Sequence, residues 1–332
     1  MSLLSWLVSL LLLLSPSSNE VIAPVQPDAG PGGKDYQFAE VLQTDFAQAP
    51  DGYWLYEPAT PKPDSAHVVV FIHGYGAYNP MIYGNWIRHL VQKGNIVIFP
   101  RYQRNLLSPK PSVFATNVAT AIKDALQELE EKAHVKPITE QLSIIGHSYG
   151  GVVSGYLGVH YEDLGIPQPK AIMMVSPGSG PFRGGRLDSY EGLDEDLKLL
   201  IMVSDNDHIV GDSFGELVFA SAKQVKQRNF IRQYADDHGK PKVSAGHNES
   251  YSLYTNFDSG LHNITAKRAK RKSKLDAVDY YGYWKLFDGL LNCTRSGSDC
   301  EFAFGNTPEQ ISLGNWSDGQ AVRPLEVILP EE

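Results

Sequence analysis

Short apolar runs alternate with amphipathic segments along most of this chain. The runs are rich in Val, Ile, Leu and Met, and they cover residues 66–74, 95–100, 141–146, 170–176 and 197–204. Segments with helical spacing lie between them, the longest at 112–133. A strand that is apolar on both faces needs cover on both faces. The pattern therefore predicts an α/β fold, with a doubly wound, mostly parallel sheet and helices on each side.

The order of these segments sets the expected domain limits. We expect one catalytic domain from 36 to 292, with Gly52 to Pro58 as an antiparallel edge strand. Residues 19–35 are rich in Pro and Gly, which predicts a linker before the domain. Residues 293–332 form a C-terminal extension whose role the sequence does not indicate.

The two ends of the chain bear on its location. The apolar run from Leu3 to Leu14 is about 12 residues long, shorter than the ~20 that span a bilayer. It resembles the core of a secretory signal covering residues 1–18, although no Lys or Arg precedes it. We expect a secreted or periplasmic protein without stable membrane insertion after signal removal; an uncleaved anchor is the alternative. In an exported protein, the closely spaced Cys293 and Cys300 predict a disulfide.

Charge limits the possible partners. The net charge of −9 disfavours nucleic acid as a general partner. The run "KRAKRKSK" at 267–274 is an exception, which fits either an anionic partner or a solvated mobile loop. Four sequons would matter only in a source that glycosylates: Asn248, Asn263, Asn292 and Asn315.

One serine stands between glycines where a predicted strand meets a predicted helix. Gly146-His147-Ser148-Tyr149-Gly150 has the form G-x-S-x-G. A sharp turn from strand to helix crowds the backbone, and flanking glycines remove the Cβ atoms that would collide. The hydroxyl should then project beyond the carboxyl edge of the sheet, where α/β sheets hold ligands. The plain alternative is a packing turn with an incidental serine.

These motifs resemble the α/β-hydrolase superfamily. "IIGHSYGG" is similar to the nucleophile turn of its lipases, cutinases and dienelactone hydrolases. "VVVFIHGYG" is similar to their oxyanion-loop segment, and the resemblance covers roughly residues 50–290. It implies an α/β-hydrolase fold and a serine esterase whose triad follows the chain order Ser, acid, His.

The resemblance suggests positions for the other two triad members. Ser-Asp-Asn-Asp-His-Ile-Val matches the family's G-x-x-D-x-x-V with Ser for Gly, which favours Asp207 over Asp205. His238 follows the predicted strand "NFIRQY", where the fold expects the base. His247, in the lipase-like "AGH", is the alternate, and His262 is a third candidate.

Two backbone N–H groups complete the expected site. The resemblance assigns the oxyanion hole to Tyr75 and Tyr149. We expect an acyl-enzyme mechanism without cofactor or metal, acting on a small-molecule or polymer-surface ester. The Gly-rich stretch from Ser176 to Asp196 lacks the apolar character of a lipase lid and is expected to shape the pocket. Amidase, thioesterase or acyltransferase activity would use the same residues, and a non-catalytic binding module is the competing hypothesis.

Overall fold

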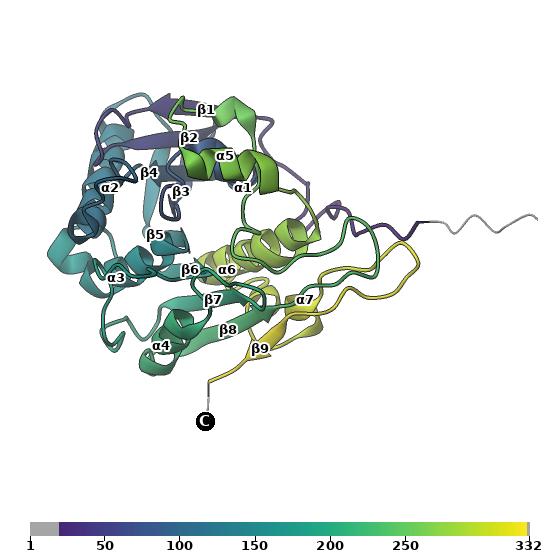
Figure 1. Ribbon diagram of the computed structural model, residues 1–332. Helices are drawn as coiled ribbons and strands as arrows, with labels where there is room; N and C mark the ends of the chain where they lie inside the picture. The colour runs from purple at the N-terminus through teal and green to yellow at the C-terminus, as the bar shows by residue number, and fades with distance from the viewer. Residues whose placement is uncertain (1–19, 331–332) are drawn as a thin grey trace, which may run out of the picture.

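A twisted sheet runs through the computed structural model, which describes residues 20–330 (Figure 1). In that range nine strands pair in the order β1-β2-β4-β3-β5-β6-β7-β8-β9. The strands are β1 (Glu40–Asp45), β2 (Tyr53–Thr60), β3 (Ser65–Ile72), β4 (Asn95–Pro100), β5 (Lys136–His147), β6 (Ala171–Val175), β7 (Lys198–Ser204), β8 (Gln227–Gln233) and β9 (Glu326–Ile328). Strands β4, β3, β5, β6, β7 and β8 run parallel to one another. The other three pair antiparallel: β1 with β2, β2 with β4, and β9 with β8. The predicted mostly parallel sheet is confirmed.

Helices cover both faces of the sheet, as the apolar runs require. They are α1 (Gly84–Gln92), α2 (Phe114–Glu131), α3 (Tyr149–Leu164), α4 (Ser213–Ser221), α5 (Ile264–Lys272), α6 (Lys285–Ser296) and α7 (Pro308–Ile311). Short turns η1 (Pro80–Tyr83), η2 (Pro111–Val113), η3 (Thr255–Phe257), η5 (Cys300–Phe302) and a π-helical segment η4 (Val278–Trp284) connect them. In β3, Val68 and Val70 join the core under α2, α3 and α4, whereas Val69 and Phe71 join the core under α1 and α6. Successive side chains thus face opposite cores.

The predicted antiparallel edge strand is present, but it is not at the edge. It corresponds to β2, which pairs with β4 on one side and with β1 on the other. Strand β1 was not predicted, and its exposed and half-buried side chains explain why its sequence carries no strong apolar signal.

Residues before 36 pack against the domain, in contrast to the linker expected there. The N–H of Gly32 donates a hydrogen bond of 2.8 Å to Asp288 Oδ2 on α6. Gly32 has a φ of 77°, and a Cβ at this position would lie 2.1 Å from the carbonyl oxygen of Tyr280, so only glycine fits. Ala23 is buried in the core under α1 and α6. The segment from 20 to 35 therefore adds to the packed body.

The C-terminal extension also belongs to the same packed body. Its strand β9 pairs with β8 and lengthens the sheet. The buried ammonium of Lys285 donates to the carbonyls of Gln310 and Ser312, at 2.9 and 2.6 Å. Trp316 is 1% exposed within the core.

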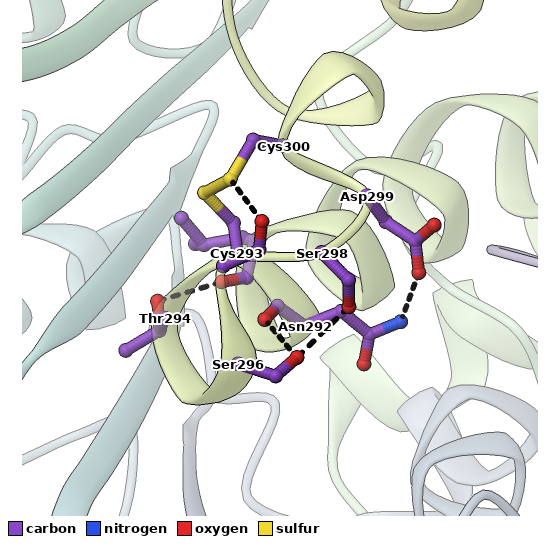
Figure 2. Close-up of a disulfide and its surroundings, with 9 residues drawn as sticks. Asn292, Cys293, Thr294, Ser296, Ser298, Asp299 and Cys300 are labelled. Atoms are coloured by element: carbon purple, nitrogen blue, oxygen red, sulfur yellow. Dashed lines mark hydrogen bonds between the residues drawn. A yellow bond between two sulfur atoms is a disulfide. The ribbon is translucent and has the colours of Figure 1, made fainter.

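The predicted disulfide joins the end of α6 to η5 (Figure 2). Cys293 and Cys300 are bonded, with their Cα atoms 4.6 Å apart. Asn292 Nδ2 donates 2.7 Å to Asp299 Oδ2 across the same turn. The expected signal at 1–18 lies outside the described residues. Between residues 20 and 330, no helix is both long enough and apolar enough to cross a membrane.

The basic run at 267–274 is mostly helical, so the interpretation as a mobile loop is wrong. It forms most of α5, whose N-cap is Asn263. Asn263 Oδ1 accepts from the N–H of Ala266 at 2.9 Å, and Ala266 and Ala269 are buried. Isolated helices this short are marginal. Tertiary contacts and the cap therefore hold α5 in place, and a sequon asparagine has a structural role.

Candidate active site

The turn between β5 and α3 holds Ser148 in an unusual backbone conformation. Its φ of 54° and ψ of −118° are rarely adopted by a residue with a side chain, which indicates strain. A Cβ on Gly146 would lie 2.2 Å from Ser154 Oγ, and one on Gly150 would lie 2.1 Å from the carbonyl oxygen of Ile72. The two glycines are therefore required by close backbone approach, as the motif predicts.

A histidine and a carboxylate form a hydrogen-bonded row with Ser148. His247 Nε2 lies 3.0 Å from Ser148 Oγ. The other ring nitrogen, Nδ1, lies 2.7 Å from Asp207 Oδ2. The carboxylate can only accept, so Nδ1 carries the proton and Nε2 is free to accept from the serine hydroxyl. This is the arrangement in which an imidazole can remove the proton from a serine.

The preference for His238 as the partner of Ser148 is corrected by the structure. His238 is exposed, and its Nε2 lies 2.7 Å from Asp318 Oδ2. After β8 the chain makes an excursion that Asp236 and Val243 close by pairing their backbones. The outgoing arm carries His238 away from the sheet, and the returning arm brings the alternate, His247, to its edge.

The returning arm is fastened to neighbouring loops. Gln233 Nε2 donates 2.6 Å to the carbonyl of Ser244, and the N–H of Asn206 donates 3.0 Å to the carbonyl of Ala245. Glu249 Oε1 accepts from the N–H of Gly246 at 2.9 Å. These bonds position His247 against the loop that carries Asp207. The third candidate base, His262, is exposed and lies 2.8 Å from Asp258 Oδ2 instead.

Asp207 is held as an ionised acceptor. Its Oδ1 accepts from the N–H groups of Ile209 and Val210, at 2.9 and 3.1 Å, which leaves Oδ2 for His247. Burial raises the pKa of Asp207, but the hydrogen bond and charge of His247 with the two N–H groups outweigh it, so the pKa lies below its ordinary value. The alternate acid, Asp205, is exposed.

The two predicted oxyanion donors belong to segments that adjoin the serine, because Tyr149 follows it and a Cβ on Gly74, next to Tyr75, would lie 3.2 Å from Ser148 Cβ. The N–H of Tyr149 opens α3 directly after Ser148. Tyr75 lies in the loop after β3, where the N–H of Gly74 donates 3.0 Å to Tyr83 Oη and that of Gly76 donates 2.7 Å to Gln103 Oε1. Hydrogen bonds thus hold the residues on both sides of Tyr75 in place. Within residues 20–330 the Tyr75 N–H has no acceptor, which leaves it for a ligand.

A family model described as Chlorophyllase matches residues 41–189 of this sequence. That family consists of serine esterases with the α/β-hydrolase fold, in agreement with the sheet described above. The chain is an α/β-hydrolase. The match supports a carboxylic ester hydrolase in general. It includes Ser148 and the loop of Tyr75 and ends before Asp207 and His247. No curated protein matches the chain significantly in sequence.

Aromatic rings cluster beside the loops that adjoin the serine of this hydrolase. Ser148 is 7% exposed. Phe182 stacks on Tyr75 with ring centroids 5.1 Å apart. Tyr149 Oη donates 2.6 Å to the carbonyl of Gly184, so the Gly-rich stretch lies against the site.

Three hydrogen bonds, two of them buried, link the oxyanion loop of the hydrolase to His247. The N–H of Gly74 donates to Tyr83 Oη, which donates 2.8 Å to His147 Nδ1. His147 Nε2 in turn donates 2.9 Å to the carbonyl of His247. Burial and the charge of His247 lower the pKa of His147 to about 3, so its ring stays neutral and Nδ1 can accept. Sequence reasoning missed both His147 and Tyr83, although His147 stands inside the serine motif.

The buried hydroxyl of Tyr83 should contribute measurably to stability. In Tyr83→Phe, the N–H of Gly74 and the Nδ1 of His147 both lose their partner, so we expect a loss of about 1–3 kcal/mol in the free energy of unfolding. Tyr56→Phe is the matched control, because Tyr56 is equally buried and its hydroxyl has no partner among residues 20–330. We expect this change to be neutral or stabilising. Urea unfolding measures both, and equal losses would contradict the linkage.

Proposed function

We propose that this hydrolase cleaves carboxylic esters with Ser148 as nucleophile, His247 as general base and Asp207 as the group that orients the base. One observation carries the proposal: His247 Nε2 is 3.0 Å from Ser148 Oγ while its Nδ1 is 2.7 Å from Asp207 Oδ2. Both distances lie within hydrogen-bonding range, so the serine proton has an acceptor and that acceptor has a fixed tautomer.

The chemistry then follows in two steps. Ser148 Oγ attacks the ester carbonyl while His247 Nε2 takes its proton, and the Asp207 carboxylate stabilises the imidazolium. The N–H groups of Tyr75 and Tyr149 bind the negative oxygen of the tetrahedral intermediate. His247 returns the proton to the leaving alcohol, which leaves an acyl-enzyme. Water activated by the same imidazole then hydrolyses the acyl-enzyme.

Two substrate classes deserve direct comparison. The Gly-rich stretch at 176–196 is polar, which favours small or polymer-surface esters over long-chain triglycerides. The name of the matched family points instead to chlorophyll. The stacked and partly exposed rings of Tyr75 and Phe182 favour this second candidate, because aromatic faces stack on flat conjugated ligands.

Export remains part of the proposal. The disulfide between Cys293 and Cys300 is compatible with an oxidising compartment, and the apolar run at 3–14 supplies a signal. We propose a secreted or periplasmic enzyme.

Labelling with a fluorophosphonate probe tests the proposal. An activated serine reacts covalently, so we expect one label on wild-type protein and none on Ser148→Ala. Hydrolysis of p-nitrophenyl esters from acetate to palmitate, and of chlorophyll, is measured on the same two proteins. The matched control is Ser154→Ala, which removes a buried hydroxyl from α3 and should keep the label. Folded wild-type protein that takes no label would favour the non-catalytic binding module.

A further inference from the structure

Six cations gather on α5 and just beyond it. We call them the basic patch: Lys267, Arg268, Lys270, Arg271, Lys272 and Lys274. All six are exposed, and residues 264–275 contain no Asp or Glu. The nearest carboxylate contact described for the α5 cations is 3.9 Å, between Lys270 Nζ and Asp258 Oδ2. The patch therefore presents concentrated positive charge on a chain whose net charge is −9.

The basic patch works against the stability of its own helix. Lys267 and Arg271, and likewise Arg268 and Lys272, are four residues apart, and like charges at that spacing repel. The helix dipole favours cations in the last turn but not near the start, where Lys267 and Arg268 lie. An anionic surface would relieve this repulsion.

The start of α5 contacts the loop that carries Tyr75. Asn263 Nδ2 donates 2.7 Å to the carbonyl of Gly76, which directly follows Tyr75. A Cβ on Gly76 would lie 2.7 Å from Thr265 Oγ1 and 2.5 Å from Leu106 Cδ2. The first turn of α5 and the loop of Leu106 therefore meet at the oxyanion loop. Figure 1 shows α5 on the outside of the molecule, where a large surface could reach it.

Two apolar side chains stand exposed at the same place. Leu107 is 98% exposed and Ile264 is 67% exposed. Leu107 follows Leu106, whose carbonyl accepts from Tyr75 Oη at 3.0 Å, and Ile264 is the first residue of α5. Apolar side chains beside a cluster of cations are what a protein uses to bind the interface of an anionic bilayer.

We propose that the basic patch, together with Leu107 and Ile264, docks the protein on a lipid bilayer with anionic headgroups and turns the Tyr75 loop of the Ser148 site toward it. A bilayer accounts for both features, since the cations meet headgroups while the apolar side chains enter the boundary of the acyl chains. A nucleic acid would leave Leu107 and Ile264 without a partner. It would also extend over the rest of the protein surface, which carries net negative charge and would repel it. Docking goes beyond ester hydrolysis and does not require it.

Co-sedimentation with vesicles tests the docking surface. We expect the full chain to bind phosphatidylcholine vesicles that contain about 30% phosphatidylglycerol and to bind pure phosphatidylcholine weakly. Binding should fall steeply as salt rises from about 0.05 to 0.5 M, because the headgroup attraction is screened. The triple variant Lys267→Glu, Arg268→Glu, Arg271→Glu should weaken binding to the anionic vesicles on the order of 100-fold, because each cation near an anionic bilayer adds to the attraction.

A matched control separates the patch from net charge. Lys123→Glu, Lys132→Glu, Lys223→Glu makes the same charge change at exposed positions away from α5 and should bind as the wild type does. All proteins carry the same N-terminal apolar run, so its contribution cancels. Circular dichroism checks that the α5 variant is folded. Equal losses in both triple variants would overturn the proposal.

The exposed apolar side chains provide a second test of the docking surface. Leu107→Ser with Ile264→Ser keeps every cation, so we expect binding at low salt to persist and the binding that survives high salt to fall about 10-fold. Unchanged vesicle binding in this variant, together with equal binding to heparin, would overturn the lipid assignment in favour of a general polyanion. The assay works equally on Ser148→Ala protein, so a failure of ester hydrolysis leaves the docking result intact.

Discussion

His247→Ala should lower kcat/KM for p-nitrophenyl acetate on the order of 10⁵-fold, whereas His238→Ala should leave it within about 2-fold. The imidazole of His247 is the group within reach of Ser148 Oγ, at 3.0 Å. Without it the serine proton has no acceptor, and only binding and the oxyanion donors remain to accelerate the reaction. His238 contacts Asp318 at the surface and has no role in the proposed reaction.

The comparison has internal controls. His238→Ala removes an exposed ring and should unfold close to the wild-type midpoint in urea, whereas His247→Ala removes a side chain that is 8% exposed and bonds Asp207, so it should lose stability and is assayed where urea unfolding shows it to be folded. The His247→Ala protein should also lose its reaction with the fluorophosphonate probe, because an unactivated serine is a poor nucleophile. Activity that survives in His247→Ala and collapses in His238→Ala or His262→Ala would reject the assignment of the base.

Local sequence signals were enough to predict the central strands of the sheet and two of the three members of the row at Ser148. The central strands are apolar on both faces because helices cover both, so their runs are visible without any knowledge of the partner. The turn at Ser148 needs Gly146 and Gly150 for close approach, and those glycines are part of the motif itself. Asp207 follows β7 directly, so its position depends on one short connection.

The identity of the base depends on contacts that are remote in sequence. His238 and His247 stand on opposite arms of one excursion; His238 has the expected position after a strand, and His247 matches a lipase-like pattern. The excursion is directed by the C-terminal extension, where Asp318 bonds His238 and Trp316 donates to Asp236 Oδ2 at 3.2 Å. No pattern near either histidine reveals these partners. The three-residue strand β9 was equally hidden, because it is too short to show a period.

Asp207→Asn should lower kcat on the order of 10⁴-fold through the tautomer of His247. The Asn side chain can keep Oδ1 as acceptor for Ile209 and Val210, so the loop should stay folded. Its amide then donates toward His247 Nδ1, which must give up its proton to accept. Nε2 would carry the proton instead and could no longer accept from Ser148.

Asp205→Asn is the matched control, two residues away on the same loop and exposed, and its activity should stay within about 2-fold of the wild type.

Stability provides an independent readout of the Asp207 carboxylate. Because the folded pKa of Asp207 lies below its ordinary value, the carboxylate stabilises the fold above the unfolded pKa of about 3.9, and this contribution is lost as pH falls through the folded pKa. The difference in unfolding free energy between wild type and Asp207→Asn should therefore be largest at neutral pH and shrink in acid. A greater loss of activity in Asp205→Asn, or a stability difference independent of pH, would show that another group orients the imidazole.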